Sequence, residues 1–104
     1  MAQFDVYLNP NPDTKQSVPY LLDVQADLLE DLATRVVVPL VTVSVMGKAA
    51  KNLNPEFKIK RISVVMSTAE LAGVPTRTLG EKVCSLKDCR NEIIAALDFL
   101  FTGF

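Results

Sequence analysis

Residues 35–45, "RVVVPLVTVSV", decide the fold class of this 104-residue chain. Valine dominates the stretch, and its branched β-carbon suits the pleated surface of a strand. Apolar residues occupy both alternating sets of positions, which predicts a strand buried on two sides. Because Pro39 has no N–H to give to a ladder, we expect this strand to lie at an edge or to bend there.

Shorter strands are predicted on both sides of it. Clean alternation over residues 3–8 predicts a half-buried strand, which a Pro/Asn-rich loop ends. Further predicted strands cover residues 19–25, 57–59, 62–66 and 74–79, the middle two forming a tight hairpin around Lys60 and Arg61. The connections are too short for parallel crossovers, so we expect one domain over residues 1–104, mainly β (α+β). The expected architecture is a small antiparallel barrel with a C-terminal helix.

The closing helix is predicted from one apolar stripe and a start signal. Ser85 has the character of an N-cap, and Asp88 stands three residues on, where a capping box needs an acid. Residues of the stripe recur at spacings of three and four: Leu86, Cys89, Ile93, Ala96, Leu97 and Leu100. Beyond Glu92 the polar side disappears. The helix end therefore lies either on its own barrel or against another molecule.

Composition excludes several function classes. Of the residues, 49% are apolar and 22% charged, and the net charge of -1 argues against sequence-independent nucleic-acid binding. The chain has no histidine, which removes the commonest general base and metal ligand, so no metal, cofactor or catalytic residue is expected. Cys84 and Cys89 are expected to be reduced, partly buried thiols. No signal peptide or membrane span is expected, which favours the cytoplasm.

Three longer passages then resemble the CcdB family of plasmid and chromosomal toxins. They are "LLDVQADLLEDLATRVVVPL" (21–40), "AGVPTRTLGEKVCSLKDCRNEI" (72–93) and the closing "TGF" (102–104). Their order and spacing together cover essentially the whole chain. The resemblance implies an SH3-like barrel with an accessory short sheet and a C-terminal helix, working as a two-fold homodimer. It also implies a toxin that binds the A subunit of DNA gyrase and traps the gyrase–DNA cleavage complex. A cognate antitoxin would neutralise it, and operator DNA would be bound only by the toxin–antitoxin complex, which represses its own operon.

The resemblance also implies site residues. Those that would face gyrase are Phe4, Leu28, Leu29, Asp98, Thr102, Gly103 and Phe104. Leu100 and Phe101 would bury the dimer seam. Thr102 and Phe104 depart from the tryptophan and isoleucine of the best-known member, and Asp98 replaces its asparagine. Threonine loses the stacking of the ring on a gyrase arginine, worth about 0.5–2 kcal/mol.

Simpler interpretations accompany two of these groups. Leu28 and Leu29 are adjacent, so packing of one in the core and exposure of the other needs no partner; with Leu32 they could cover the core from a turn. Residues 48–61 contain five basic residues and a single acidic one, Glu56. The basic residues are Lys48, Lys51, Lys58, Lys60 and Arg61. These side chains either keep a sheet edge solvated or form a docking surface for an acidic antitoxin tail.

Two other functions remain open. The chain could be a dimer of the same fold that no longer poisons gyrase, because Thr102 replaces the stacking ring. The same barrel superfamily also contains toxins that cut messenger RNA, and Arg35, Asp23 and Thr34 are the residues available for such chemistry. Without histidine, no arrangement of these three residues signals an active site.

Overall fold

The computed structural model describes residues 1–103, which form seven strands, two α-helices and four short 3-10 helices. The strands are β1 (Asp5–Leu8), β2 (Tyr20–Asp23), β3 (Thr34–Thr42), β4 (Glu56–Ile59), β5 (Ile62–Met66), β6 (Ala72–Pro75) and β7 (Lys82–Ser85). The helices are α1 (Val43–Met46), α2 (Arg90–Thr102), η1 (Asp27–Leu29), η2 (Thr68–Glu70), η3 (Thr76–Thr78) and η4 (Lys87–Cys89).

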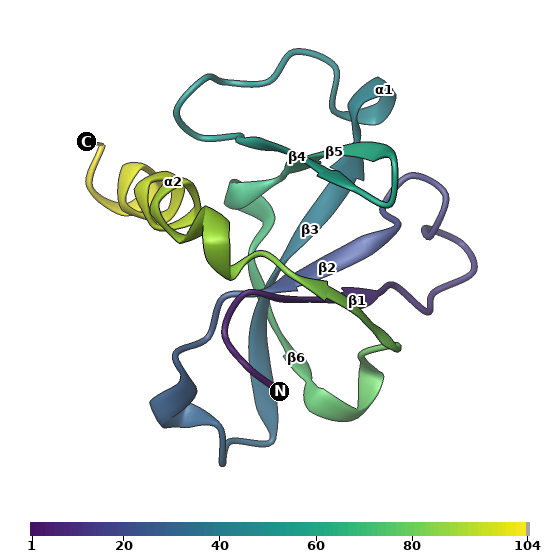
Figure 1. The fold of residues 1–104 in the computed structure, drawn as a ribbon, viewed down its shortest axis with the longest axis vertical. Helices are drawn as coiled ribbons and strands as arrows, with labels where there is room; N and C mark the ends of the chain where they lie inside the picture. The colour runs from purple at the N-terminus through teal and green to yellow at the C-terminus, as the bar shows by residue number, and fades with distance from the viewer. Residues whose placement is uncertain (104) are drawn as a thin grey trace.

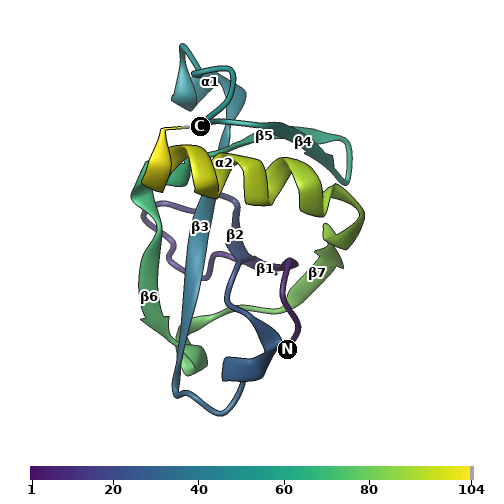
Figure 2. The ribbon, with the colours of Figure 1, turned by 90° about the vertical axis from the view of Figure 1, so that its left-hand side faces the viewer.

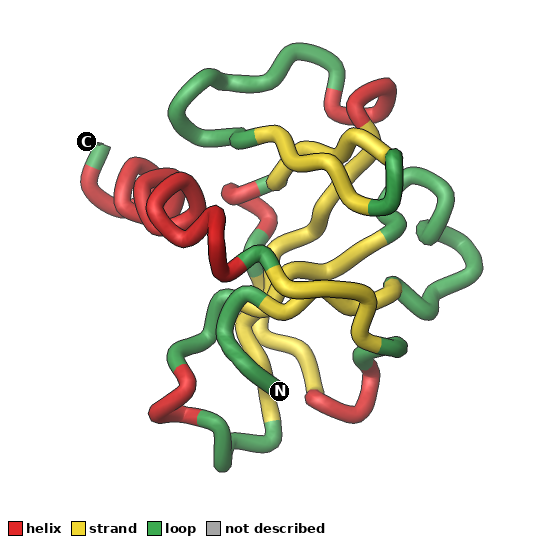
Figure 3. The backbone as a smooth tube through the Cα atoms, viewed as in Figure 1, coloured by secondary structure: helices red, strands yellow, loops and turns green. Residues whose placement is uncertain are grey.

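All the strand pairs are antiparallel, and the long strand β3 connects the rest. The order across the sheet is β4-β5-β3-β2-β1-β7, and β6 pairs with the first half of β3. The sheet curls into a half-barrel, with α2 on one side of it (Figures 1 and 3). The predicted class, a mainly antiparallel β fold with one C-terminal helix, is confirmed.

The central position of β3 corrects the expectation drawn from Pro39. The strand is paired on both sides, with β2 along one edge and β6 then β5 along the other. Pro39 lies where the partner changes, between Val37, which pairs with Ala72, and Leu40, which pairs with Met66. A missing N–H costs little there, because neither β6 nor β5 extends across that position.

The boundaries at both ends of the chain also differ from the predictions. The segment at residues 82–85 is a strand that pairs with β1, not the approach to a helix. Ser85 therefore does not cap α2, which begins at Arg90 after η4; the Ser85 hydroxyl instead accepts the Lys87 N–H at 3.2 Å. With β2 and β7 on either side, β1 is not half-buried: Asp5 and Tyr7 are buried along with Val6.

The β4–β5 hairpin follows the prediction and adds its turn geometry. Lys60 and Arg61 both have positive φ, 48° and 71°, as a two-residue type I′ turn requires. That turn type suits the right-handed twist of the strands. It is ordinarily made by Asn and Gly, since other residues are strained there.

The core lies between the concave face of the sheet and α2 (Figure 2). Val38 and Leu40 of β3 meet Ile93 and Ala96 of the helix in one cluster, and all four are fully buried. The predicted stripe is confirmed as core-facing for Leu86, Cys89, Ile93, Ala96 and Leu97, whereas Leu100 is half-buried and outside the cluster. Within residues 1–103, no helix combines the length and the apolar character that a membrane crossing needs.

Candidate functional site

An apolar groove of about 480 Å³ separates the last turns of α2 from the segment that follows β2. Its wall on the helix side is made by Leu97 and Phe101, which lie one turn apart on the same face. The opposite wall and floor come from Val24, Gln25, Ala26, Leu29, Leu32, Thr34, Val36 and Leu71. The fold thus brings together residues that are about 70 positions apart in the sequence.

The leucines of the η1 segment project from the molecule instead of covering the core. Leu28 is 96% exposed, Leu29 49% and Leu32 52%, and η1 has no buried residue. The expectation that one of the first two packs inside is therefore wrong. Leu29 and Leu32 line the groove without being buried in it.

The helix end continues this exposed apolar surface. Phe101 is 71% exposed, while Leu100 is only half-buried. Asp98 is also exposed, three and four residues before Phe101 and Thr102, and so shares their side of the helix. Phe101, expected at the dimer seam, and Leu29, expected to face gyrase, line one groove.

Two hydrogen bonds involve the residues at the end of the helix. The Thr102 hydroxyl donates to the carbonyl of Asp98 at 2.7 Å, so it is engaged within the helix. Gly103 is left-handed (φ 79°), and its N–H donates to the Phe99 carbonyl at 2.9 Å, as in a glycine C-cap. Phe104 lies outside the described residues.

Phe4 is not at the surface, contrary to its expected place facing gyrase. Its side chain is 3% exposed and belongs to the core cluster. Its backbone, at φ 72°, donates to the Asp23 carbonyl and accepts from the Leu86 N–H. Phe4 therefore supports, from inside, the junction between β2 and the segment that leads into α2.

The five basic side chains of the predicted docking surface are all exposed. Lys48, Lys51, Lys58, Lys60 and Arg61 lie at the surface, and within residues 1–103 none of the five lies in an ion pair. Lys58, Lys60 and Arg61 belong to the β4–β5 hairpin, whereas Lys51 borders a hollow beside Glu92 of α2. The group thus spans the β4–β5 hairpin and the loop between α1 and β4.

A buried ion pair lies beneath the η1 segment. Arg35 and Asp23 are 1% and 0% exposed, with Arg35 Nη2 at 2.6 Å and Nε at 2.8 Å from Asp23 Oδ2. Desolvation raises the pKa of Asp23, and the hydrogen bond from Arg35 opposes that rise. Both side chains are enclosed and bonded to each other, and Arg35 also lines a hollow of about 310 Å³ beside Glu30 and Asp31.

A second buried polar group joins β1 to β7. The Tyr7 hydroxyl donates to Asp5 Oδ2 at 3.3 Å, and Lys82 Nζ lies 3.4 Å from Asp5 Oδ1. Burial, together with the charges of Asp5 and Asp23, raises the pKa of Tyr7 to about 12.

The two cysteines lie on β7 and η4 and are half-buried free thiols. Burial raises the pKa of both Cys84 and Cys89, which keeps them protonated near neutral pH. A protonated thiol is a poor nucleophile and a poor metal ligand.

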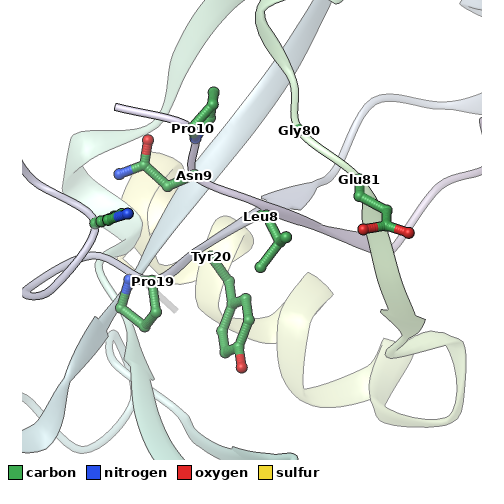
Figure 4. A pocket seen from close by; sticks show the side chains of 8 residues that line it. Leu8, Asn9, Pro10, Pro19, Tyr20, Gly80 and Glu81 are labelled. Carbon is green, nitrogen blue, oxygen red and sulfur yellow. The ribbon is translucent and has the colours of Figure 1, made fainter. Parts of the chain in front are cut away.

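A further hollow, of about 500 Å³, lies beside the end of β1 (Figure 4). Leu8, Pro19 and Tyr20 provide its apolar part. Backbone groups around it already bond one another: Leu8 N–H donates to the Glu81 carbonyl, and Gly80 N–H to that of Leu8. None of the predicted site residues lines it.

The groove contains residues that were not predicted as site residues, above all Leu32 and Leu97. Leu32 follows Leu29 by three residues, and that spacing was the available signal. Leu97 was assigned to the core stripe, which it also joins.

A comparison with known protein families gives a match: residues 3–103 fit the model of the family described as CcdB protein.

Proposed function

The chain belongs to the CcdB family, the toxins of toxin–antitoxin pairs, and from that premise we propose that it binds the A subunit of DNA gyrase and traps the gyrase–DNA cleavage complex. The proposed action is binding, with no catalytic step by the toxin itself. Its place of action would be the cytoplasm, where gyrase works.

The observation that carries this proposal is the exposed apolar surface around the groove. Leu28 is 96% exposed, and Leu29 and Phe101, which both line the groove, are 49% and 71% exposed; exposed apolar side chains in a group mark a contact surface. Burying one such side chain against a partner contributes about 1.5–3 kcal/mol. The proposed contact with gyrase, the gyrase face, consists of Leu28, Leu29, Asp98, Thr102, Gly103 and Phe104.

A second copy of the chain would complete the surface. Phe101 and Leu100 at the end of α2 would meet their counterparts across a two-fold axis, the commonest closed arrangement. The gyrase faces of the two copies would then lie side by side. Phe4 has no place in the contact, because its side chain is enclosed; we assign it to support of the face.

Mechanistically, trapping requires tighter binding to one gyrase state than to the others. If the paired gyrase faces fit only the open, cleaved enzyme, binding shifts the population toward that state by the difference in affinity. No covalent chemistry by the toxin is needed.

The cognate antitoxin would neutralise the toxin through an acidic segment. The five basic side chains at the surface, none of them in an ion pair within residues 1–103, suit such a segment by charge complementarity. Toxin and antitoxin together would repress their own operon, the complex alone contacting operator DNA.

Supercoiling and DNA-cleavage assays with purified gyrase test the proposal. Deleting Gly103 and Phe104 should abolish inhibition and toxicity while leaving the unfolding midpoint of the barrel nearly unchanged, because among residues 1–103 no side chain beyond Leu97 belongs to the core cluster or packs against it. Leu28→Ala with Leu29→Ala should weaken inhibition about 100-fold, from two lost apolar contacts of about 1.4 kcal/mol each.

A matched control is Val43→Ala with Val45→Ala, which trims two other exposed apolar side chains, on α1. That variant should inhibit gyrase as the parent does. A truncated chain that stays toxic would refute the assignment of the gyrase face.

The second candidate is a dimer of this fold that does not act on gyrase. It is favoured by Thr102, whose hydroxyl is already bonded to the Asp98 carbonyl and offers no ring for stacking. Toxicity in cells that disappears in gyrase-A mutants supports the first function; toxicity that persists in them supports the second.

A further inference from the structure

The loop that carries the exposed leucines has almost no hold on the core. Every residue of the segment 26–34 is exposed, including the three leucines. Its own backbone bonds, such as Leu29 N–H to the Ala26 carbonyl and Leu32 N–H to the Leu29 carbonyl, fix its shape but not its place. Its C-terminal end is held by the Thr76 N–H, which donates to the Ala33 carbonyl, and by the pairing of Thr34 with Pro75, so the part that carries the leucines needs a further connection to the sheet.

That connection is the side chain of Gln25, which is 6% exposed. Its Nε2 donates to the Leu29 carbonyl at 3.0 Å, and its Oε1 accepts the Val36 N–H at 3.0 Å. One buried amide therefore ties the tip of the loop to the central strand β3.

The backbone of Gln25 is itself held by the buried ion pair. The backbone N–H of Gln25 donates to Asp23 Oδ1 at 3.0 Å, and its backbone carbonyl lies 3.5 Å from Arg35 Nη2. On the far side of the loop, the Gln3 N–H donates to Asp27 Oδ1 at 2.7 Å. The bond from Gln3 is exposed, whereas the two bonds of the Gln25 side-chain amide are partly buried and so are less open to competition from water.

We propose that Gln25 is a positioning residue, which fixes the leucine loop (residues 26–34) in the orientation that presents Leu28 and Leu29 to the partner. This inference rests on the proposed function for the identity of that partner. It does not require Gln25 to touch the partner. Its physical basis is preorganisation: a loop held in its bound orientation loses less conformational freedom on association.

The test compares Gln25→Met with Gln16→Met. Gln25→Met keeps the length of the side chain and removes both hydrogen bonds of its amide group. Gln16 is exposed, and its amide makes no hydrogen bond within residues 1–103. Amide hydrogen exchange is measured in the free protein, and affinity for purified gyrase A by titration. Gln25→Met should speed exchange of the Leu29, Glu30 and Leu32 amides about tenfold and weaken gyrase binding about five- to tenfold.

Exchange in β3, β5 and α2 should change little, and Gln16→Met should match the parent in every measurement. Loop exchange at the parental rate would overturn the proposal. So would a released loop that still binds gyrase as tightly as the parent does. A parent chain that does not bind gyrase refutes the proposed function instead, and the exchange rates then decide by themselves whether Gln25 positions the loop.

Should Gln25→Met not fold, Gln25→Glu replaces it, measured at about pH 9, where the introduced carboxyl is ionised. It keeps the acceptor for Val36 N–H and loses the donor to the Leu29 carbonyl. The proposal then expects a protected Val36 amide together with fast exchange in the loop; slow exchange in the loop would contradict it.

Discussion

At the scale of single residues, burial of polar groups marks where the structure is most constrained. Asp5 and Tyr7 lie inside although their alternation with Val6 predicts a wet face, because β7 pairs with β1 and Lys82 lies over the carboxylate. The carboxylate and the phenol are bonded to each other, so the cost of desolvation is offset by hydrogen bonding.

Tyr7 makes stability sensitive to alkaline pH. Its pKa is about 12 in the folded state against the ordinary value of 10.0, mainly through burial and the neighbouring carboxylates. Because the pKa of Tyr7 is higher in the folded than in the unfolded state, the stability that the protonated phenol contributes is complete below the unfolded-state pKa. That stability is lost as the pH rises toward and through the folded-state pKa. Between about pH 9 and about pH 11.5, the parent should lose about 2 kcal/mol of unfolding free energy relative to Tyr7→Phe. Urea unfolding at both pH values measures this, and parallel pH dependence of the two proteins would refute it.

At the scale of elements, the turn of the β4–β5 hairpin combines a strained backbone with exposed positive charges. Lys60 and Arg61 occupy left-handed conformations that Asn and Gly adopt at lower cost. Lys58, on the edge strand β4, adds a further exposed charge, which deters pairing with a foreign strand. A turn selected for stability alone would not be expected to contain these two residues.

Replacing Lys60→Asn and Arg61→Gly together should therefore stabilise the fold by about 1 kcal/mol, as relief of backbone strain. The same change removes two of the five proposed antitoxin-facing charges, so antitoxin affinity should fall and depend less on salt. Thermal unfolding and titration with the antitoxin at two salt concentrations measure the two effects. Lys15→Asn, an exposed lysine outside the group, should leave antitoxin affinity unchanged. Undiminished affinity in the hairpin variant would remove the basic group from the proposed interface.

At the scale of the whole molecule, the Asp23–Arg35 pair joins β2 to β3 from inside. Removing one partner leaves an uncompensated charge in the interior, which costs about 3–5 kcal/mol. Replacing both by apolar side chains removes both charges at once and should recover much of that loss.

We expect Arg35→Met to lower the free energy of unfolding by about 3–5 kcal/mol. Adding Asp23→Leu to it should restore stability toward the parental value, although the Gln25 N–H then loses its acceptor. The double-mutant cycle is measured by urea unfolding of the parent, of Arg35→Met, of Asp23→Leu and of the variant that carries both changes. If the losses of the single variants simply added, the pair would not be the coupled unit described above.

Much of the fold follows from local patterns in the sequence. Valine-rich alternation located β3, the two-residue gap located the β4–β5 hairpin, and apolar spacing of three and four located the core side of α2. These signals are local because side-chain direction repeats every two residues in a strand and about every 3.6 residues in a helix. β7 was missed, because four residues beside a strong helix pattern carry too little periodicity.

Membership of the CcdB family and the exposed apolar end of α2 could also be inferred from sequence, whereas the site geometry could not. Periodicity states which side a residue faces and does not state what covers that side. Only tertiary pairing decided that Phe4 is enclosed, that Leu28 and Leu29 both project, and that Pro39 is tolerated at the centre of the sheet. Likewise, the groove between Leu29 and Phe101 exists because the folded sheet brings two distant segments together, a contact that no local pattern encodes.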